Sequence, residues 1–104
     1  MTSNHPGAKV EIYTRVYCGY CIHAKQLLRN KNIDFVEYAI DGNEQARRQM
    51  MERAEGRCSL PQIFINDLGI GGYIELKQLD DGGQLDNMLC SYAGVNANFG
   101  QGSP

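Results

Sequence analysis

Residues 10–21 are VEIYTRVYCGYC, and they carry the strongest structural signal in the chain. Apolar or β-branched residues alternate with polar or aromatic ones over 10–15, a period of two that predicts a short β-strand. Cys18 and Cys21 follow the strand, and Ala24 and Leu28 then continue one apolar face at helical spacing. The stretch therefore predicts a strand that leads directly into a helix, with two cysteines at the junction.

The remaining chain continues this alternation of strands and helices. Asp41, with Glu44 three residues later, is typical of a helix start, and Gly56 is expected to end that helix. After the first helix the pattern predicts a strand over 33–40, a helix over 41–56, strands over 61–65 and 68–70, and a helical region over 74–89 interrupted at 82–83.

The resulting order, β-α-β-α-β-β-α, predicts an α/β fold with a four-stranded mixed sheet flanked by helices. The first two strands, joined by a helix, should be parallel through a right-handed crossover. The last two, joined by a short turn, should form an antiparallel hairpin. We expect helices on both faces of this sheet.

Length and composition indicate one domain. The chain has 104 residues, of which 42% are hydrophobic and 21% are charged, as in ordinary globular proteins. Its 10 basic and 12 acidic residues give a net charge of −2, which argues against binding nucleic acid through clustered Lys and Arg. We expect a flexible lead-in over 1–8, a domain over 9–90 and a disordered tail over 91–104.

No secretory signal and no apolar run of the ~20 residues that a membrane span needs is visible in the sequence. A protein of a reducing compartment, the cytoplasm, is the interpretation that fits. In such a compartment, closely spaced cysteines are catalytic or metal-binding more often than structural.

The position of the cysteine pair favours redox chemistry. A sulfur at a helix N-terminus faces unpaired backbone N–H groups and the positive end of the helix dipole, and both favour thiolate over thiol. We predict that Cys18 is the nucleophile, with Arg15 and Lys25 as candidate cations beside it. Cys21 lies one turn inward and is predicted to resolve a mixed disulfide on Cys18. Gly19, where a proline often begins a helix, loosens this turn.

A structural zinc site is the alternative interpretation of the pair. Such a site needs a second closely spaced pair of ligands, whereas Cys58 and Cys90 are isolated from each other. His23 lies two residues from Cys21 and so points away from its face of the helix. No metal ligand is therefore predicted.

Five motifs in order make the chain resemble the glutaredoxins, particularly the small bacterial dithiol type, from about residue 9 to residue 89. The motifs are Val10-Glu11-Ile12-Tyr13-Thr14-Arg15, Cys18-Gly19-Tyr20-Cys21, Ile40-Asp41-Gly42, Leu60-Pro61-Gln62-Ile63-Phe64-Ile65 and Ile70-Gly71-Gly72-Tyr73. The resemblance implies a thioredoxin fold, glutathione as redox co-substrate, and a cis peptide bond before the proline of the fourth motif.

The resemblance also implies a glutathione-binding groove. In the family the residue before the cis-proline Pro61, here Leu60, offers its backbone to the cysteinyl part of glutathione, and Tyr20 lines the same groove. Arg15 stands where the family places a basic residue for the glycine carboxylate, and Arg57 is a candidate second cation.

The γ-glutamyl end of glutathione is expected at the helix that opens after Gly72. Its carboxylate would be received by the backbone N–H groups of Tyr73 and Ile74, an anion site at a helix terminus. The family commonly has an acidic residue where Ile74 stands, to contact the glutamyl amine. In this chain only the neighbouring Glu75 could make that contact.

The other two cysteines receive weaker predictions. Cys58 lies three residues before Pro61, and we predict a structural role, with a redox-sensitive side role as the alternative. Cys90 ends an apolar helical stretch and is predicted to be a packed helix-end residue.

Taken together, these features predict a glutathione-dependent oxidoreductase that reduces protein disulfides and glutathione mixed disulfides. Its expected partners are glutathione and disulfide-bonded or glutathionylated proteins, with no nucleic acid or membrane, and it is expected to act as a monomer. One alternative is a dimer that carries a glutathione-ligated [2Fe–2S] cluster on Cys18, because a glycine in place of the motif's proline resembles members in which this occurs. A thioredoxin-like reductase fed by a flavoenzyme is less consistent with a chain that has no tryptophan.

Overall fold

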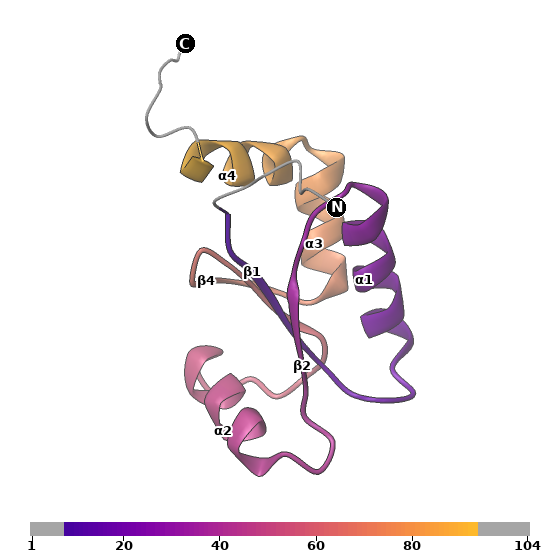
Figure 1. Cartoon of the computed structure of the whole chain (residues 1–104), viewed down its shortest axis with the longest axis vertical. Coiled ribbons are helices and arrows are strands. Elements are labelled where there is room, and N and C mark those ends of the chain that lie inside the picture. Colours follow the sequence, from indigo (N-terminus) through magenta and orange to yellow (C-terminus); the bar gives the residue numbers. More distant parts are fainter. Residues whose placement is uncertain (1–7, 94–104) are drawn as a thin grey trace.

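The computed structural model describes residues 8–93, and side chains within 8–89. Its elements are β1 (Val10–Thr14), α1 (Gly19–Asn30), β2 (Val36–Ala39), α2 (Glu44–Arg53), β3 (Gln62–Ile65), β4 (Leu68–Gly71), α3 (Tyr73–Asp81) and α4 (Gln84–Ala93) (Figure 1). The order confirms the α/β prediction. The last helical region is two helices, because the chain breaks at Gly82, where α3 ends, and at Gly83, with φ +78°.

The sheet confirms the predicted pairing. Its strand order is β2-β1-β3-β4, with β1 and β2 parallel and the β1·β3 and β3·β4 pairs antiparallel. All five residues of β1 are buried. Alternate residues of β1 therefore do not alternate between buried and exposed positions. The two faces of the strand pack into two different cores.

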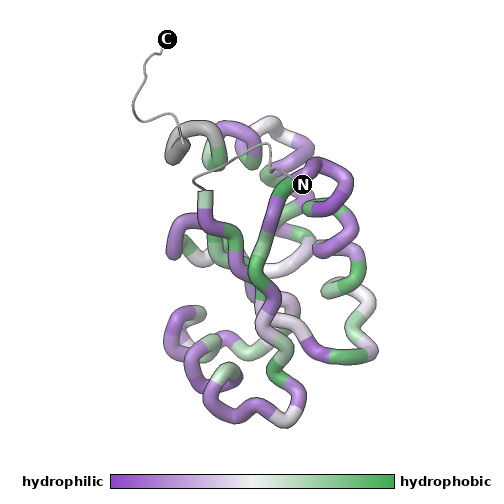
Figure 2. Tube along the Cα trace, viewed as in Figure 1, coloured by the Kyte–Doolittle hydropathy of each residue, from purple (hydrophilic) through white to green (hydrophobic). Residues whose placement is uncertain are grey.

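Helices cover both faces of the sheet, as expected. α1 and α3 lie side by side on one face, and α2 lies on the other (Figure 1). The larger core contains Ile12 and Ile63 from the strands and Leu28, Leu76 and Leu85 from α1, α3 and α4. The smaller core, under α2, consists of Tyr13, Met50, Ala54 and Phe64. α2 is mostly hydrophilic (Figure 2), and it presents only Ala46 and Met50 as buried residues.

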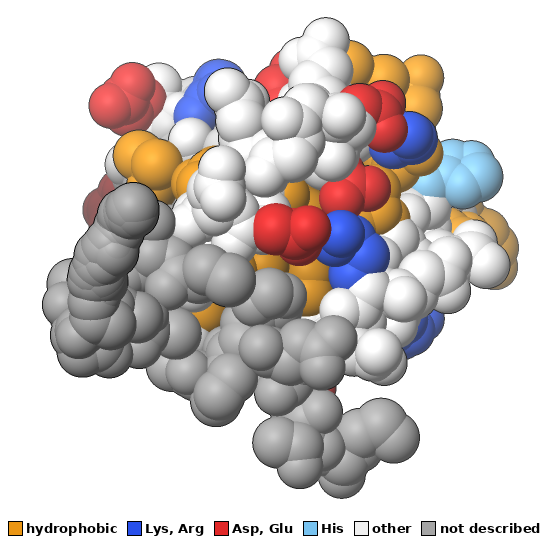
Figure 3. Space-filling model, turned by 90° about the horizontal axis from the view of Figure 1, so that it is seen from above, with side chains coloured by type: hydrophobic (Ala, Val, Ile, Leu, Met, Phe, Trp, Pro, Cys, Tyr) orange, Lys and Arg blue, Asp and Glu red, His pale blue; other side chains and the backbone are white. Residues whose placement is uncertain are grey.

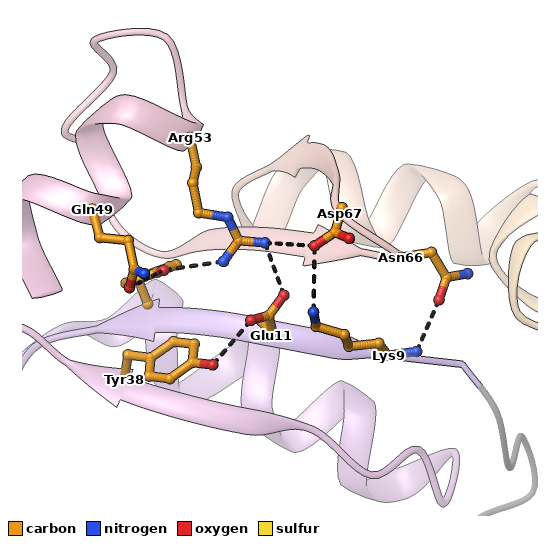
Figure 4. Close-up of polar contacts among 8 residues, drawn as sticks. Lys9, Glu11, Tyr38, Gln49, Arg53, Asn66 and Asp67 are labelled. Atoms are coloured by element: carbon orange, nitrogen blue, oxygen red, sulfur yellow. Dashed lines mark hydrogen bonds and ion pairs between the residues drawn. The ribbon is translucent and has the colours of Figure 1, made fainter.

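Two groups of polar contacts join elements that are distant in sequence. Lys31, just after α1, forms ion pairs of 2.9 Å with Asp80 and 3.2 Å with Asp86, and Figure 3 looks onto this end of the molecule, where acidic and basic side chains lie next to one another. Beneath α2, Arg53 reaches the buried Glu11 of β1 at 2.8 Å (Figure 4).

The start of α2 differs from the prediction. Its N-cap is Asn43, whose Oδ1 accepts the backbone N–H of Ala46 at 3.0 Å, so the prediction of Asp41 as the cap is wrong. An amide and a carboxylate are equally good caps, and the sequence pattern does not distinguish two candidates separated by one glycine. The Asp41 carboxylate instead accepts the backbone N–H of Val16.

Of the predicted domain limits, the lead-in over 1–8 and the tail over 91–104 lie almost entirely outside the described residues. Within the described residues, α4 continues to Ala93. None of the described helices is long and apolar enough to span a membrane.

Candidate redox site

The cysteine pair lies at the start of α1, as predicted. Cys18 is the N-cap residue, with extended backbone angles of φ −118° and ψ 104°, and its Sγ accepts the backbone N–H of Cys21 at 3.1 Å. The two sulfurs form a disulfide, and the Cα atoms are 5.2 Å apart. The pair is thus placed to exchange between dithiol and disulfide at the positive end of a helix.

The two sulfurs differ in access. Cys18 is 9% exposed, whereas Cys21 is 1% exposed and packs at the base of the helix. An incoming thiol or disulfide can therefore reach Cys18 more readily than Cys21. The roles of Cys18 as nucleophile and Cys21 as resolving residue stay predictions, and this difference in exposure is consistent with them.

The loop before β3 forms one wall of the site. The Leu60–Pro61 peptide bond is cis, which confirms the prediction, and the carbonyl oxygen of Leu60 lies 3.9 Å from Cys18 Sγ. Gln62, which is 2% exposed, donates from Nε2 to the Ser59 carbonyl at 2.9 Å and to Ser59 Oγ at 3.2 Å. The buried amide therefore anchors the segment that presents Leu60. Sequence reasoning assigns no role to Gln62, although a polar residue within an apolar strand is a usable signal.

The start of α3 lies against the cis-proline. Gly72 packs so closely on Pro61 that a Cβ at this position would lie 3.3 Å from the Pro61 carbonyl oxygen. The ring of Tyr73 stacks on that of Tyr20, with centroids 6.1 Å apart. The structure thus brings together residues from α1, the loop before β3 and the start of α3.

Glu75 has a different partner from the one expected from sequence. Its Oε1 accepts the backbone N–H of Gly72 at 2.7 Å, so this carboxylate caps its own helix. Ile74, one residue before it, is 50% exposed. The first-turn N–H groups of a helix have no partner within the helix, and Tyr73, whose ring stacks on that of Tyr20, is the first residue of α3.

Of the two predicted cations, Lys25 is engaged elsewhere. Its Nζ lies 2.9 Å from Oε2 of Glu37, which also accepts the hydroxyl of Thr14 at 2.6 Å. Partial burial acts to raise the pKa of Glu37, but the hydrogen bonds from Thr14 and Lys25 hold it below its usual range. The assignment of Lys25 to the sulfur is not supported. Arg15 is exposed and, among the described residues, forms no ion pair.

Arg57 does not join the group around Cys18. Its Nε donates to the carbonyl of Ala54 at 3.0 Å. A Cβ atom added to Gly69 in β4 would lie 3.5 Å from Nη2 of the Arg57 guanidinium. The side chain is therefore turned along β4. Cys58, the next residue, is an exposed free thiol, and the side chain of Cys90 lies outside the described part of the chain.

The residues present do not by themselves fit a metal centre. Within the part of the chain that the structure describes, no group of three or more His, Cys, Asp or Glu side chains could hold an ion. An iron–sulfur cluster is usually held by four thiolates, and because one chain contributes only Cys18 at this position, the predicted cluster would need Cys18 from two chains together with glutathione.

Comparison with known proteins gives a consistent result. The glutaredoxin family profile matches residues 10–70. A probable glutaredoxin of Synechocystis is 57% identical over 84 residues, which cover 81% of this chain and 77% of the relative. Glutaredoxin 3 of Escherichia coli is 49% identical over 82 residues, covering 79% of this chain and 98% of that protein. The solution structure of a glutaredoxin from Brucella melitensis superposes with a TM-score of 0.67 at 43% identity, covering 78% and 87% of the two chains.

Proposed function

Since the chain belongs to the glutaredoxin family, we propose that its thiol–disulfide oxidoreductase activity depends on glutathione and proceeds through a covalent intermediate on Cys18. The observation that carries this proposal is the position of Cys18 at the N-cap of α1, with its Sγ 3.1 Å from the backbone nitrogen of Cys21. Glutaredoxins use glutathione, and this N–H group together with the helix dipole favours the thiolate that such a reaction needs.

Removal of glutathione from a protein takes two exchanges. The Cys18 thiolate attacks the glutathione sulfur of the mixed disulfide, which breaks the S–S bond and releases the protein as a thiolate. A second glutathione thiolate then attacks the sulfur of glutathione bound to Cys18. The products are oxidised glutathione and the Cys18 thiolate, so one free glutathione is consumed and the other half of the oxidised glutathione comes from the substrate.

Reduction of a protein disulfide uses both cysteines. Cys18 attacks one sulfur of the substrate and forms a mixed disulfide, and Cys21 then attacks Cys18 Sγ. The substrate leaves as a dithiol, and the enzyme is left with the Cys18–Cys21 disulfide that the structure shows. Two glutathiones return the enzyme to the dithiol and become oxidised glutathione.

We propose that glutathione lies across the groove between Leu60 and the stacked pair of Tyr20 and Tyr73. The backbone of Leu60 would pair with its cysteinyl part, and the first-turn N–H groups of α3 would receive its γ-glutamyl carboxylate. These groups come from one chain, which supports action as a monomer. We propose the cytoplasm as the location, because closely spaced cysteines in a reducing compartment are more often catalytic than structural.

A coupled assay tests the dependence on glutathione. With a glutathionylated protein as substrate, glutathione reductase and NADPH, turnover should require added glutathione. When glutathione is replaced by thioredoxin and its reductase, the rate should fall to the background without enzyme. Equal rates with the two reductants would contradict the proposal.

Arg15→Ala should raise KM for a glutathione mixed disulfide about tenfold and leave kcat within about twofold. A tenfold change in KM corresponds to about 1.4 kcal/mol, near the lower limit for a hydrogen bond between charged groups. Steady-state kinetics with varied mixed disulfide measure the effect. Arg57→Ala is the matched control, because its guanidinium is turned along β4, and its KM should stay within about twofold. Equal losses in the two variants would mean that Arg15 has no special role.

A further inference from the structure

One side chain from a distant part of the chain holds the loop that connects β1 to Cys18. The backbone N–H of Val16 donates to Oδ2 of Asp41 at 2.8 Å. Two residues earlier, the carbonyl of Thr14 accepts the backbone N–H of Ile40 at 2.9 Å. The carboxylate of Asp41 therefore extends the β1·β2 ladder by one bond beyond the last backbone pair, Thr14 with Ala39.

The carboxylate is itself held in place by a tight turn. The backbone N–H of Asn43 donates to the Ile40 carbonyl at 3.0 Å, and Gly42, the third residue of the turn, has φ +66°. This is the backbone region that a type II turn requires at its third residue and that favours glycine. Asn43 then caps α2, so the turn is fixed at both ends.

The loop that Asp41 holds contains a residue in an unfavourable conformation. Tyr17 has φ +55°, a left-handed backbone that residues other than glycine rarely adopt. Its side chain is 99% exposed, so packing of the ring does not stabilise this conformation. The restraint must come from the two flanking residues, which are Val16, bound to Asp41, and Cys18, bound into the first turn of α1.

We infer that Asp41 is a positioning residue: its hydrogen bond to Val16 sets the path of the loop and thereby places Cys18 Sγ against the N–H groups of α1. The inference rests on the proposed role of Cys18 as nucleophile. The hydrogen bond, and not the negative charge, is the useful property of Asp41, because a negative charge does not favour an ionised sulfur.

Three substitutions separate geometry from charge. Asp41→Asn retains an oxygen acceptor at the same distance from the backbone and removes the charge, so the variant should keep the reactivity of Cys18 within about twofold. Asp41→Glu retains the charge and displaces the acceptor by one methylene, and Asp41→Ala removes the acceptor. Both should lower kcat/KM for a glutathionylated substrate, by about tenfold in the alanine variant, because misplacement of a reacting group by about 1 Å has effects of this order or larger.

The direct readout is alkylation of Cys18 in the reduced full-length protein. Its rate with iodoacetamide is followed as a function of pH by mass spectrometry that localises the first adduct. In Asp41→Ala the rate at pH 6 should fall about tenfold, and the midpoint of the pH profile should move up by about one unit. Asp34→Asn and Asp34→Ala are the matched controls, because Asp34 is an exposed aspartate whose loss causes the same change of charge, and they should leave the profile unchanged.

The order of the variants decides the outcome. The inference is supported if Asp41→Asn resembles the wild type while Asp41→Glu and Asp41→Ala lose reactivity. It is overturned if the asparagine variant is as impaired as the others, or if a folded alanine variant keeps the wild-type profile. Should the alanine variant fail to fold, the comparison of asparagine with glutamate still separates the position of the acceptor from its charge. Alkylation needs no glutathione, so a wild-type enzyme that does not use glutathione would contradict the proposed function without affecting this comparison.

Discussion

Cys18→Ser should lower the turnover of both glutathionylated proteins and protein disulfides by at least about 10³-fold. A serine hydroxyl has the size of the thiol but is scarcely ionised near pH 7, so the attack on a disulfide sulfur is lost. Both reactions should be lost, because both begin with attack by Cys18, the cysteine at the N-cap of α1. At 9% exposed, it is the more exposed residue of the pair. The coupled glutathione assay on each substrate measures the loss.

Cys21→Ser should separate the two reactions. Cys21 is 1% exposed and can reach only the sulfur of Cys18, so it is needed when a protein disulfide must be resolved within the enzyme. The rate of deglutathionylation should stay within about threefold of wild type, because a second glutathione resolves the intermediate on Cys18. Turnover of a protein disulfide should fall to the background.

Cys58→Ser is the matched control for both variants. It removes an exposed thiol from the loop before the cis-proline without touching the Cys18–Cys21 pair, and both activities should remain near wild type. A Cys21→Ser variant without deglutathionylation would contradict the assignment of roles, and so would a Cys18→Ser variant that retains it.

The features that local pattern determines can be predicted from sequence. The strand before Cys18, the helix after it, and the break at 82–83 each depend on neighbouring residues, and all are found in the structure. The start of α2 is predicted at the wrong residue, because Asp41 and Asn43 are both suitable caps and tertiary contact with Val16 decides between them.

The same division applies to the candidate site. The cysteine pair and the cis-proline are local motifs, and the structure contains both. The partners of long side chains are not local: Lys25 is bound by Glu37 of β2, and Arg57 lies over β4. The sequence identifies these cations but not their partners, because strand pairing brings the partners together and a flexible side chain can reach several of them.

Arg53→Met should lower the free energy of unfolding by about 3 kcal/mol at pH 7, because it leaves a buried carboxylate without its partner. Arg53 Nη2 lies 2.8 Å from Oε1 of Glu11, whose side chain is 6% exposed (Figure 4). The guanidinium also contacts the Tyr13 hydroxyl at 3.0 Å and lies over the ring of Phe64 at 4.1 Å. These contacts attach the mostly hydrophilic α2 to the sheet. Urea denaturation followed by circular dichroism measures the change.

Arg47→Met is the matched control on the same helix. Arg47 pairs with Glu44 at 3.7 Å, but their side chains are 47% and 70% exposed, and such pairs contribute little. Its loss should change the free energy of unfolding by less than about 0.5 kcal/mol. The double variant of Arg53→Met with Glu11→Leu should be less destabilised than the sum of the single changes, because it removes both charges from the interior.

The dependence on pH identifies Glu11 as the cause. Burial acts to raise the pKa of Glu11, but hydrogen bonds from Arg53 and Tyr38 outweigh it and hold the pKa below the ordinary value of 4.5. Because the folded-state pKa is the lower one, this carboxylate stabilises the wild type above about pH 4.5, and the stabilisation is lost as pH falls through the folded-state value. In Arg53→Met only the hydrogen bond from Tyr38 and the charge of Lys9 still oppose the effect of burial, so the Glu11 pKa should rise and protonation should relieve part of the penalty. The difference in stability between variant and wild type should therefore shrink between pH 7 and pH 4. A difference that is constant over this range would mean that lost packing on Phe64, and not the unpaired charge, causes the destabilisation.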